Sequence, residues 1–168
     1  MNSYNQYLDP NSDIIKKVIK TYPHGFSTKG LVTTILIESG GNPNAESEGG
    51  GYVGLGQVGL SEYEEYGPKG GHRLNPEDNL MCVCNLAQCN SHLLRHGLGR
   101  EPTDAEIYLA HQQGGMGALK LIKHPNTRAG DLVGDSHIRE NGGNANNPAF
   151  VFVQHWTNKF LSNEAVNG

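Results

Sequence analysis

Apolar residues recur at the three-to-four-residue spacing of a helix along most of the chain, and clusters of glycine, asparagine and proline separate the periodic segments. This spacing predicts helices over residues 13–20, 28–39, 61–66, 76–95, 103–112 and 118–123, and a last helix after Pro148. No segment sustains the alternation of apolar and polar residues that is typical of a strand. The pattern therefore predicts a mainly α fold with at most a small hairpin between residues 49 and 58.

Local signals mark several helix ends. Asn75 is followed by a proline and two acids, which is a strong start for the long helix. Thr103 and Glu106 form a capping box at the start of another helix. Gly97 is expected to end the long helix, because glycine is a poor helix former and a frequent terminator.

Three stretches lack helical periodicity. Residues 1–11 are expected to be a loose lead-in, and residues 124–147 are polar and predict a long loop or a pair of turns. Residues 40–59 contain eight glycines, which allow the backbone to approach a ligand closely. The chain of 168 residues has no internal repeat and no linker, so we expect one domain spanning residues 1–168.

Composition argues against several classes of function. The 13 Lys and Arg residues against 17 Asp and Glu residues give a formal net charge of −4, which argues against nucleic-acid binding driven by counterion release. No apolar run approaches the ~18 residues of a membrane span, so membrane insertion is not expected. The first ten residues lack the basic and apolar regions of a signal peptide.

Three cysteines lie within eight residues, at Cys82, Cys84 and Cys89. Their odd number and close spacing do not form a disulfide framework. Together with His92 they could be taken for a zinc site, but the spacing differs from the usual two-residue knuckle. Small core residues in a reduced chain are the favoured interpretation.

Glu38 carries the strongest chemical signal. It lies at the C-terminal end of an apolar helix and is followed by glycines. The negative end of the helix dipole and the apolar neighbours both disfavour a carboxylate there. They favour a protonated carboxylic acid, which is the form that a general acid requires. A glutamate that only bonds loop amides would fit the same residues.

The sequence around Glu38 resembles the catalytic motif of the soluble lytic transglycosylase family and its goose-type lysozyme relatives. Residues 38–47 read Glu-Ser-Gly-Gly-Asn-Pro-Asn-Ala-Glu-Ser, which fits the motif almost position for position. Residues 54–57 read Gly-Leu-Gly-Gln and fit a second block, with Gly56 where the family usually has methionine. Residues 74–80 resemble the start of the long helix in that family.

A fourth block departs from the family. Residues 110–114 read Ala-His-Gln-Gln-Gly where the family has Ala-Tyr-Asn-x-Gly, so His111 and Gln112 stand in place of two residues that line the cleft. Phage-type members often read Tyr-Leu-Ala-His here, as residues 108–111 do. The departure therefore looks like a subfamily mark, and the four blocks occur in the family's order.

The resemblance implies a lysozyme-like single domain that cleaves the β-1,4 bond between N-acetylmuramic acid and N-acetylglucosamine in peptidoglycan. Glu38 would be the catalytic acid and then the base, forming 1,6-anhydromuramic ends, with no metal and no organic cofactor. Glycan strands would be the partner. The residues expected to bind them are Ser39, Tyr52, Gly54, Leu55, Gln57, Tyr108, His111 and Gln112.

Three of these binding residues have a second interpretation. Ser39 could cap its helix, Gln57 could support the loop, and His111 could be a core histidine. Tyr52 could form a platform for a sugar ring, whereas Trp156 and Phe160 are expected to pack in the core.

Two alternatives to transglycosylation remain open. If Glu46, Glu48 or Asp78 faced Glu38 at the distance typical of inverting enzymes, plain hydrolysis would follow. The changed residue at position 111 would also fit a non-catalytic module that binds peptidoglycan or belongs to a virion. Without a signal peptide, the chain would reach the wall by a holin, on a phage particle or through a secretion apparatus.

Overall fold

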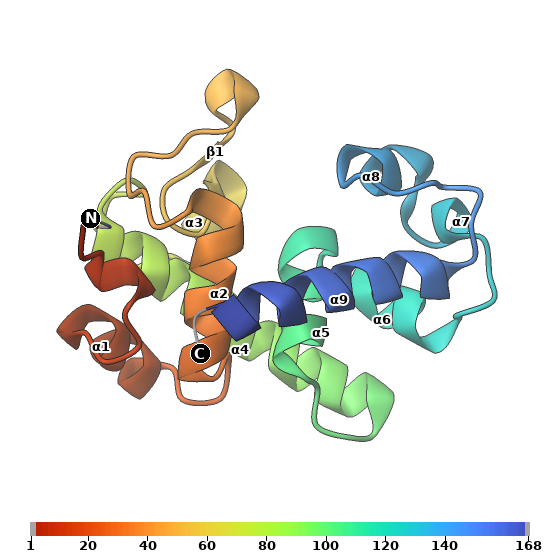
Figure 1. Cartoon of the computed structure of the whole chain (residues 1–168), viewed down its shortest axis with the longest axis horizontal. Helices are drawn as coiled ribbons and strands as arrows, with labels where there is room; N and C mark the ends of the chain where they lie inside the picture. Colours follow the sequence, from red (N-terminus) through yellow and green to blue (C-terminus); the bar gives the residue numbers. More distant parts are fainter. Residues whose placement is uncertain (1–2, 167–168) are drawn as a thin grey trace. The chain divides into compact units, whose positions relative to one another are not determined.

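The computed structural model describes residues 3–166 and is mainly helical, with one two-stranded antiparallel sheet in that range (Figure 1). In chain order its elements are η1 (Gln6–Leu8), α1 (Asp13–Thr21), α2 (Thr28–Ser39), η2 (Glu48–Gly50), β1 (Tyr52–Val53), β2 (Val58–Gly59), α3 (Leu60–Tyr66), α4 (Pro76–Leu98), α5 (Asp104–Gln113), α6 (Gly115–Lys123), α7 (Ala129–Val133), α8 (Asp135–Glu140) and α9 (Ala149–Val166). The predicted fold class, mainly α with a small hairpin, is confirmed.

The chain divides into two compact units. Unit 1 comprises Met1–Cys89 and Asn163–Gly168, and unit 2 comprises Asn90–Ser162. Both boundaries fall inside long helices, one in α4 and one in α9. The expectation of one domain over the whole chain stays a prediction.

Helix α2 is the central element of unit 1. Six consecutive residues from Gly30 to Ile35 are buried, so the helix is covered on all sides rather than along the single stripe that the sequence suggested. Its two buried hydroxyls are satisfied within the helix, because Thr33 donates to the Lys29 carbonyl at 2.8 Å and Thr34 donates to the Gly30 carbonyl at 2.9 Å. Polar residues can therefore lie inside this core at little cost.

The N-terminal segment is better fixed than a loose lead-in. Residues 6–8 form η1, and the Asn5 amide donates to the carbonyl of Gly41 at 3.0 Å. A Cβ atom at Gly41 would lie 2.5 Å from that same amide nitrogen. This segment therefore packs on the turn that follows α2, and only glycine fits at the contact.

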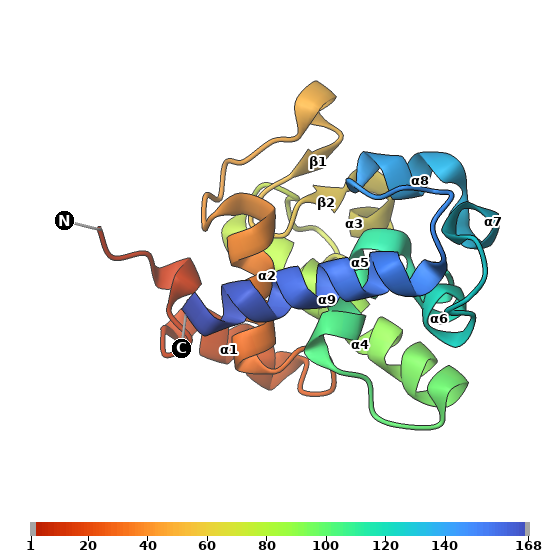
Figure 2. The same ribbon diagram turned by 45° about the vertical axis from the view of Figure 1, so that its right-hand side comes forward.

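The hairpin after α2 pairs Tyr52 with Gly59 and Val53 with Val58 (Figure 2). The side chain of Asn79, fully buried in α4, binds it. The Asn79 amide donates to the carbonyl oxygens of Val53 at 3.0 Å and of Arg73 at 2.9 Å, and its oxygen accepts the Gly56 N–H at 2.9 Å. One side chain thus bonds three backbone groups, two of them in buried hydrogen bonds.

Gly97 does not end α4, which continues to Leu98. A Cβ atom at Gly97 would lie 2.5 Å from a methyl carbon of Leu119, so glycine is needed here for close packing against α6. The helix ends instead before Gly99, whose φ is +70° and whose N–H bonds the Arg95 carbonyl at 3.0 Å. Tertiary packing, not helix termination, explains the glycine at position 97.

Residues 124–147 were expected to form a loop, but they contain α7 and α8. Arg128 holds this segment together. Its guanidinium bonds both carboxylate oxygens of Asp135 at 2.9 Å, Asp131 at 2.9 Å and the amide oxygen of Asn146 at 2.9 Å. These contacts join polar side chains, and the spacing of apolar residues therefore does not indicate either short helix.

The three cysteines are free thiols. Cys82 and Cys84 are buried in α4, and burial raises the pKa of each thiol to about 12. They are core residues, as the sequence suggested, whereas Cys89 is exposed and is not.

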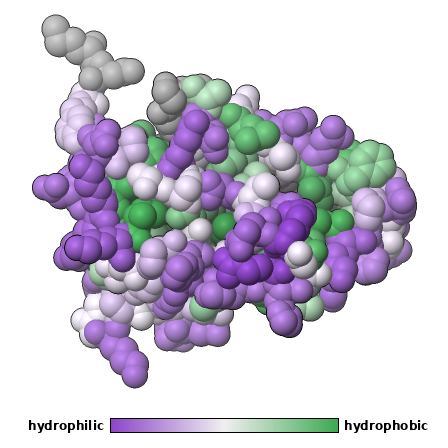
Figure 3. Space-filling view, turned by 90° about the horizontal axis from the view of Figure 1, so that it is seen from below, coloured by the Kyte–Doolittle hydropathy of each residue, from purple (hydrophilic) through white to green (hydrophobic). Residues whose placement is uncertain are grey.

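No helix within residues 3–166 is long and apolar enough to cross a membrane. On the face drawn in Figure 3, hydrophobic residues reach the surface in small areas between hydrophilic ones.

The Asn79 contacts predict a large loss of stability on truncation. Asn79→Ala removes three hydrogen bonds to the backbone, two of them buried, so we expect the free energy of unfolding to fall by about 2–4 kcal/mol in urea denaturation. Asn42→Ala is the control, because exposed Asn42 accepts an N–H from Asn44 in a surface turn and its loss should cost less than about 1 kcal/mol. Equal losses in the two variants would contradict this role for Asn79.

The Arg128–Asp135 pair predicts a pH dependence. The hydrogen bond from Arg128 lowers the pKa of the Asp135 carboxyl. Because the folded-state pKa lies below the unfolded one, the pair stabilises unit 2 above the unfolded pKa, and this contribution is lost as the pH falls through the folded pKa. Thermal unfolding followed from pH 6 to about pH 2 should show a smaller acid-induced decrease for Asp135→Asn and for Arg128→Ala than for the unchanged chain. An undiminished decrease in both variants would rule out the pair as its source.

Candidate functional site

Glu38 lies in the last turn of α2 and is half-buried. The helix ends at Gly40, which adopts a left-handed conformation with φ +61° and donates its N–H to the Leu36 carbonyl at 3.0 Å. Gly41 follows with φ +79°. The two glycines turn the chain sharply away from the helix axis, and Glu38 is therefore the last acid before a tightly folded loop.

Ser39 connects the end of α2 to the glycine-rich loop. Its hydroxyl lies 2.8 Å from the carbonyl oxygen of Leu55, to which it donates, and it accepts the N–H of Gly41 at 3.3 Å. The hydroxyl also lies 3.1 Å from the Ile35 carbonyl oxygen, so Ser39 bonds the end of its own helix as well as the loop. These contacts fix the position of the residue next to Glu38.

Gln57 closes the turn of the second sequence block. Its side-chain nitrogen donates to the carbonyl oxygens of Ala45 at 3.2 Å and of Gly54 at 3.1 Å. Among residues 3–166 it is the one non-glycine residue with positive φ, at +50°. Such a backbone conformation is strained for a residue with a Cβ atom, and the two side-chain hydrogen bonds offset that strain.

The remaining residues of the second block are buried rather than open to a ligand. Leu55 is fully buried, so its side chain packs in the core and is not available for the expected glycan contact. Gly54 has φ +79°, and a Cβ atom there would collide with the Asn79 amide. A Cβ atom at Gly56 would collide with Val83. These residues shape the loop and bring it close to α4.

The hairpin has a second support from Arg73. Its guanidinium donates to the carbonyl oxygens of Gly51 at 3.0 Å and of Val58 at 3.3 Å. Because one of these carbonyls directly precedes β1 and the other belongs to β2, Arg73 joins the two arms of the hairpin.

The acids considered as partners of Glu38 have different surroundings. Glu46 and Glu48 are both exposed in the loop. Asp78, in the first turn of α4, accepts the His72 N–H at 2.8 Å and holds the turn before that helix. Asp78 is therefore a structural acid.

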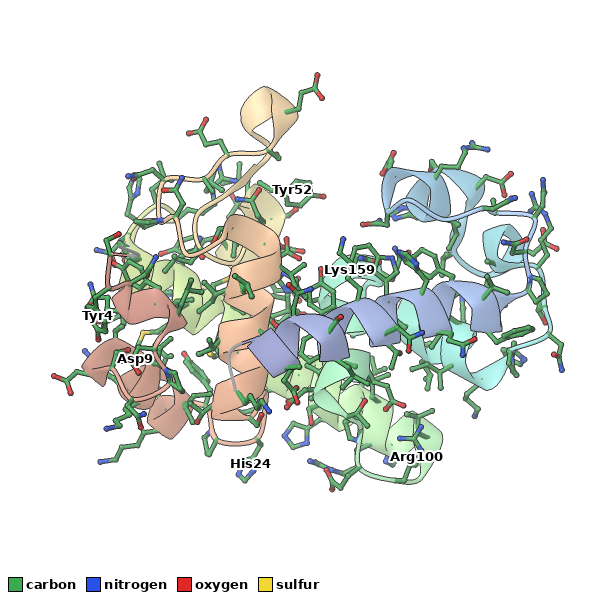
Figure 4. All side chains as sticks on the ribbon, in the orientation of Figure 1. Tyr4, Asp9, His24, Tyr52, Arg100 and Lys159 are labelled. Atoms are coloured by element: carbon green, nitrogen blue, oxygen red, sulfur yellow. The ribbon has the colours of Figure 1, made fainter. Side chains whose placement is uncertain are left out.

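Tyr52 is exposed beside a small pocket of about 250 Å³. Its side chain projects from the hairpin (Figure 4). The pocket is lined by Gly51, Tyr52, Gly59, Leu60, Ser61 and Glu62. Glu62 accepts the Gly59 N–H at 3.0 Å, and its carboxylate is thereby held at the pocket wall.

The other three candidate residues belong to unit 2. Tyr108 is buried, with its ring centroid 5.9 Å from that of Trp156 and 5.5 Å from that of Phe160, so it is part of the aromatic core of this unit. The expected core packing of Trp156 and Phe160 is confirmed. His111 is half-buried, and its ring stacks against Tyr108 at 6.2 Å.

Gln112 accepts a hydrogen bond from Gln113 at 3.1 Å. It lies next to the break between α5 and α6, where Gly114 has φ +76°.

Three residues that form or support this region have no role predicted from the sequence. Asn79 and Arg73 hold the hairpin, and Glu62 lines the pocket. A usable signal existed for Asn79, because it is a polar residue one position before the first buried leucine of α4. Glu62 stands three residues after Gly59, where a glutamate can bond the backbone at the start of a helix, whereas Arg73 follows no period or motif.

In the part of the chain that the structure describes, no three His, Cys, Asp or Glu side chains form a group that could hold a metal ion. The arrangement in unit 1 is thus a half-buried acid at the end of a central helix, followed by a loop whose shape is fixed by side-chain hydrogen bonds. No protein-family model matches the chain, and no curated protein matches it.

Proposed function

We propose that the chain cleaves the β-1,4 bond between N-acetylmuramic acid and N-acetylglucosamine in peptidoglycan, with Glu38 as the catalytic acid and base. The proposal includes a lysozyme-like fold and glycan strands as the substrate. The chain would act in the cell wall, reached by a holin, on a phage particle or through a secretion apparatus.

One observation carries the proposal: three separate sequence blocks that resemble the lytic transglycosylases meet at one loop. Ser39 of the first block bonds Leu55 of the second at 2.8 Å. Gln57 of the second block bonds Ala45 of the first at 3.2 Å. Asn79 of the third block accepts the Gly56 N–H at 2.9 Å. Residues of a shared motif that are far apart in sequence are expected to contact one another when the motif serves a single site.

The chemistry needs one proton donor at the position of Glu38. The protonated carboxyl gives its proton to the bridging oxygen as the bond from that oxygen to C1 of the muramic sugar breaks. The resulting carboxylate accepts the proton of the muramic C6 hydroxyl, and the oxygen of that hydroxyl bonds to C1. The products are a 1,6-anhydro ring and a free hydroxyl on the leaving sugar, and no water is consumed.

Hydrolysis of the same bond would require a second carboxylate to activate a water molecule. The candidates in the loop, Glu46 and Glu48, are exposed, and Asp78 already holds a backbone N–H. This favours the intramolecular route, in which the substrate supplies its own nucleophile.

Replacing the acid should abolish activity. Clearing of purified cell walls by Glu38→Gln is expected to be roughly 10²–10⁴-fold slower than by the unchanged chain, because glutamine has no proton to donate. Glu46→Gln is the matched control and should clear the walls at the unchanged rate. Equal clearing by the Glu38→Gln chain and the unchanged chain would remove Glu38 from the mechanism, and no clearing by the unchanged chain would favour a binding module.

The products distinguish the two chemical routes. Mass spectrometry of the released muropeptides should find anhydromuramic ends, which are lighter by one water molecule (about 18 Da) than the reducing ends of a hydrolase product. Cell walls digested by an established hydrolytic lysozyme are the control. Reducing ends as the main product would overturn the intramolecular route while leaving glycosidic cleavage intact.

A further inference from the structure

The wall of the pocket beside the hairpin contains both polar groups and exposed apolar side chains. The pocket combines a fixed carboxylate, a hydroxyl and two large apolar side chains in about 250 Å³. Tyr52 is 53% exposed and Leu60 is 60% exposed, although both are large hydrophobic residues. Large apolar side chains left open next to polar groups are a common sign of a binding site.

The tyrosine ring is held in place from one side. A Cβ atom at Gly59 would lie 3.2 Å from Cε1 of Tyr52, so the ring rests on the backbone of its hairpin partner. The absence of a side chain at Gly59 is what allows this contact. A ring supported in this way offers a rigid apolar surface to a ligand and loses little conformational entropy on binding.

The carboxylate is fixed as well. Oε2 of Glu62 accepts the Gly59 N–H at 3.0 Å, so the group that supports the ring also orients the acid. Ser61 lies between Leu60 and Glu62, and its side chain is exposed. The pocket therefore presents a carboxylate and a hydroxyl next to an aromatic ring.

The charge of the surrounding segment limits the ligand. Residues 46–78 contain seven Asp and Glu residues and two Lys and Arg residues. An anionic ligand such as a phosphate would be repelled here. A neutral ligand with several hydroxyls, an apolar ring face and the size of one hexose matches the pocket, because a carboxylate accepts hydrogen bonds from hydroxyls and an aromatic ring packs against the C–H face of a sugar.

We infer that this pocket is a subsite for one N-acetylated pyranose of the glycan, bound by Tyr52, Ser61 and Glu62 with the acetyl methyl against Leu60. The inference rests on the proposed function for its ligand class. The subsite belongs to the same unit as Glu38 and lies on the hairpin that follows the end of α2 (Figure 4). It would select substrates by glycan length, because a chain too short to fill it loses the contact with Tyr52.

The test is a titration of the full-length Glu38→Gln chain with chitotetraose, followed by the backbone amide resonances in NMR. We expect the amides of Tyr52, Gly59, Ser61 and Glu62 to shift together on binding. Adding Tyr52→Ala should weaken binding about tenfold. Tyr52→Phe keeps the ring and should bind within about twofold of the parent, and the amide spectrum of Tyr52→Ala away from the pocket should match the parent's, which excludes misfolding as the cause of the loss.

Tyr4→Ala is the matched control, since Tyr4 is 75% exposed in the N-terminal segment, outside this pocket. It should leave the affinity unchanged. Unchanged affinity in Tyr52→Ala, resonance shifts confined to other residues, or no binding of chitotetraose at all would each overturn the subsite.

Cell-wall clearing by the same variants with Glu38 restored separates the two proposals. Chitotetraose binding at Tyr52 by a chain that clears no walls would support the subsite and overturn the proposed reaction. Clearing that is equally fast with tyrosine or alanine at position 52 would overturn the subsite and leave the reaction in place.

Discussion

The hydrogen bonds of one asparagine set the geometry of unit 1. Asn79 lies fully buried in α4 and binds backbone groups of Val53, Gly56 and Arg73. The loop between α2 and α3 has only two-residue strands, and its own backbone hydrogen bonds are supplemented by those from Asn79. An amide side chain supplies both a donor and an acceptor at one point, which no apolar residue and no carboxylate could do.

The region around Glu38 is consequently rigid where a reaction would need rigidity. The loop backbone is bound by three side chains, those of Ser39, Gln57 and Asn79. Gln57 accepts an unfavourable backbone conformation to do so. The side chains of these motif residues therefore fix the shape of the loop. The side chains that are open to a ligand, such as that of Tyr52, belong to neighbouring residues outside the motif.

Sequence alone predicted the elements that local interactions specify. The capping box of Thr103 and Glu106 is present with both hydrogen bonds, and the serines that precede α1 and α2, Ser12 and Ser27, also cap their helices. The wrong predictions share a cause: each depends on side-chain contacts that the spacing of apolar residues does not indicate.

Those misses were specific. Gly97 looked like a helix end but accommodates Leu119, and the polar stretch after residue 124 folds into two short helices because Arg128 bridges it. The same holds in the candidate site, where Leu55 and Tyr108 were assigned to ligand contact but are core residues. The motif located Glu38 and its loop, whereas the roles of individual side chains depended on burial.

Unit 1 is discontinuous along the chain. Its last piece begins at residue 163, and there Glu164 forms an ion pair with Lys29 at 3.5 Å. Most of unit 1, including Glu38, therefore leaves the ribosome first, but the unit is complete only after the C-terminal end of α9 has been synthesised.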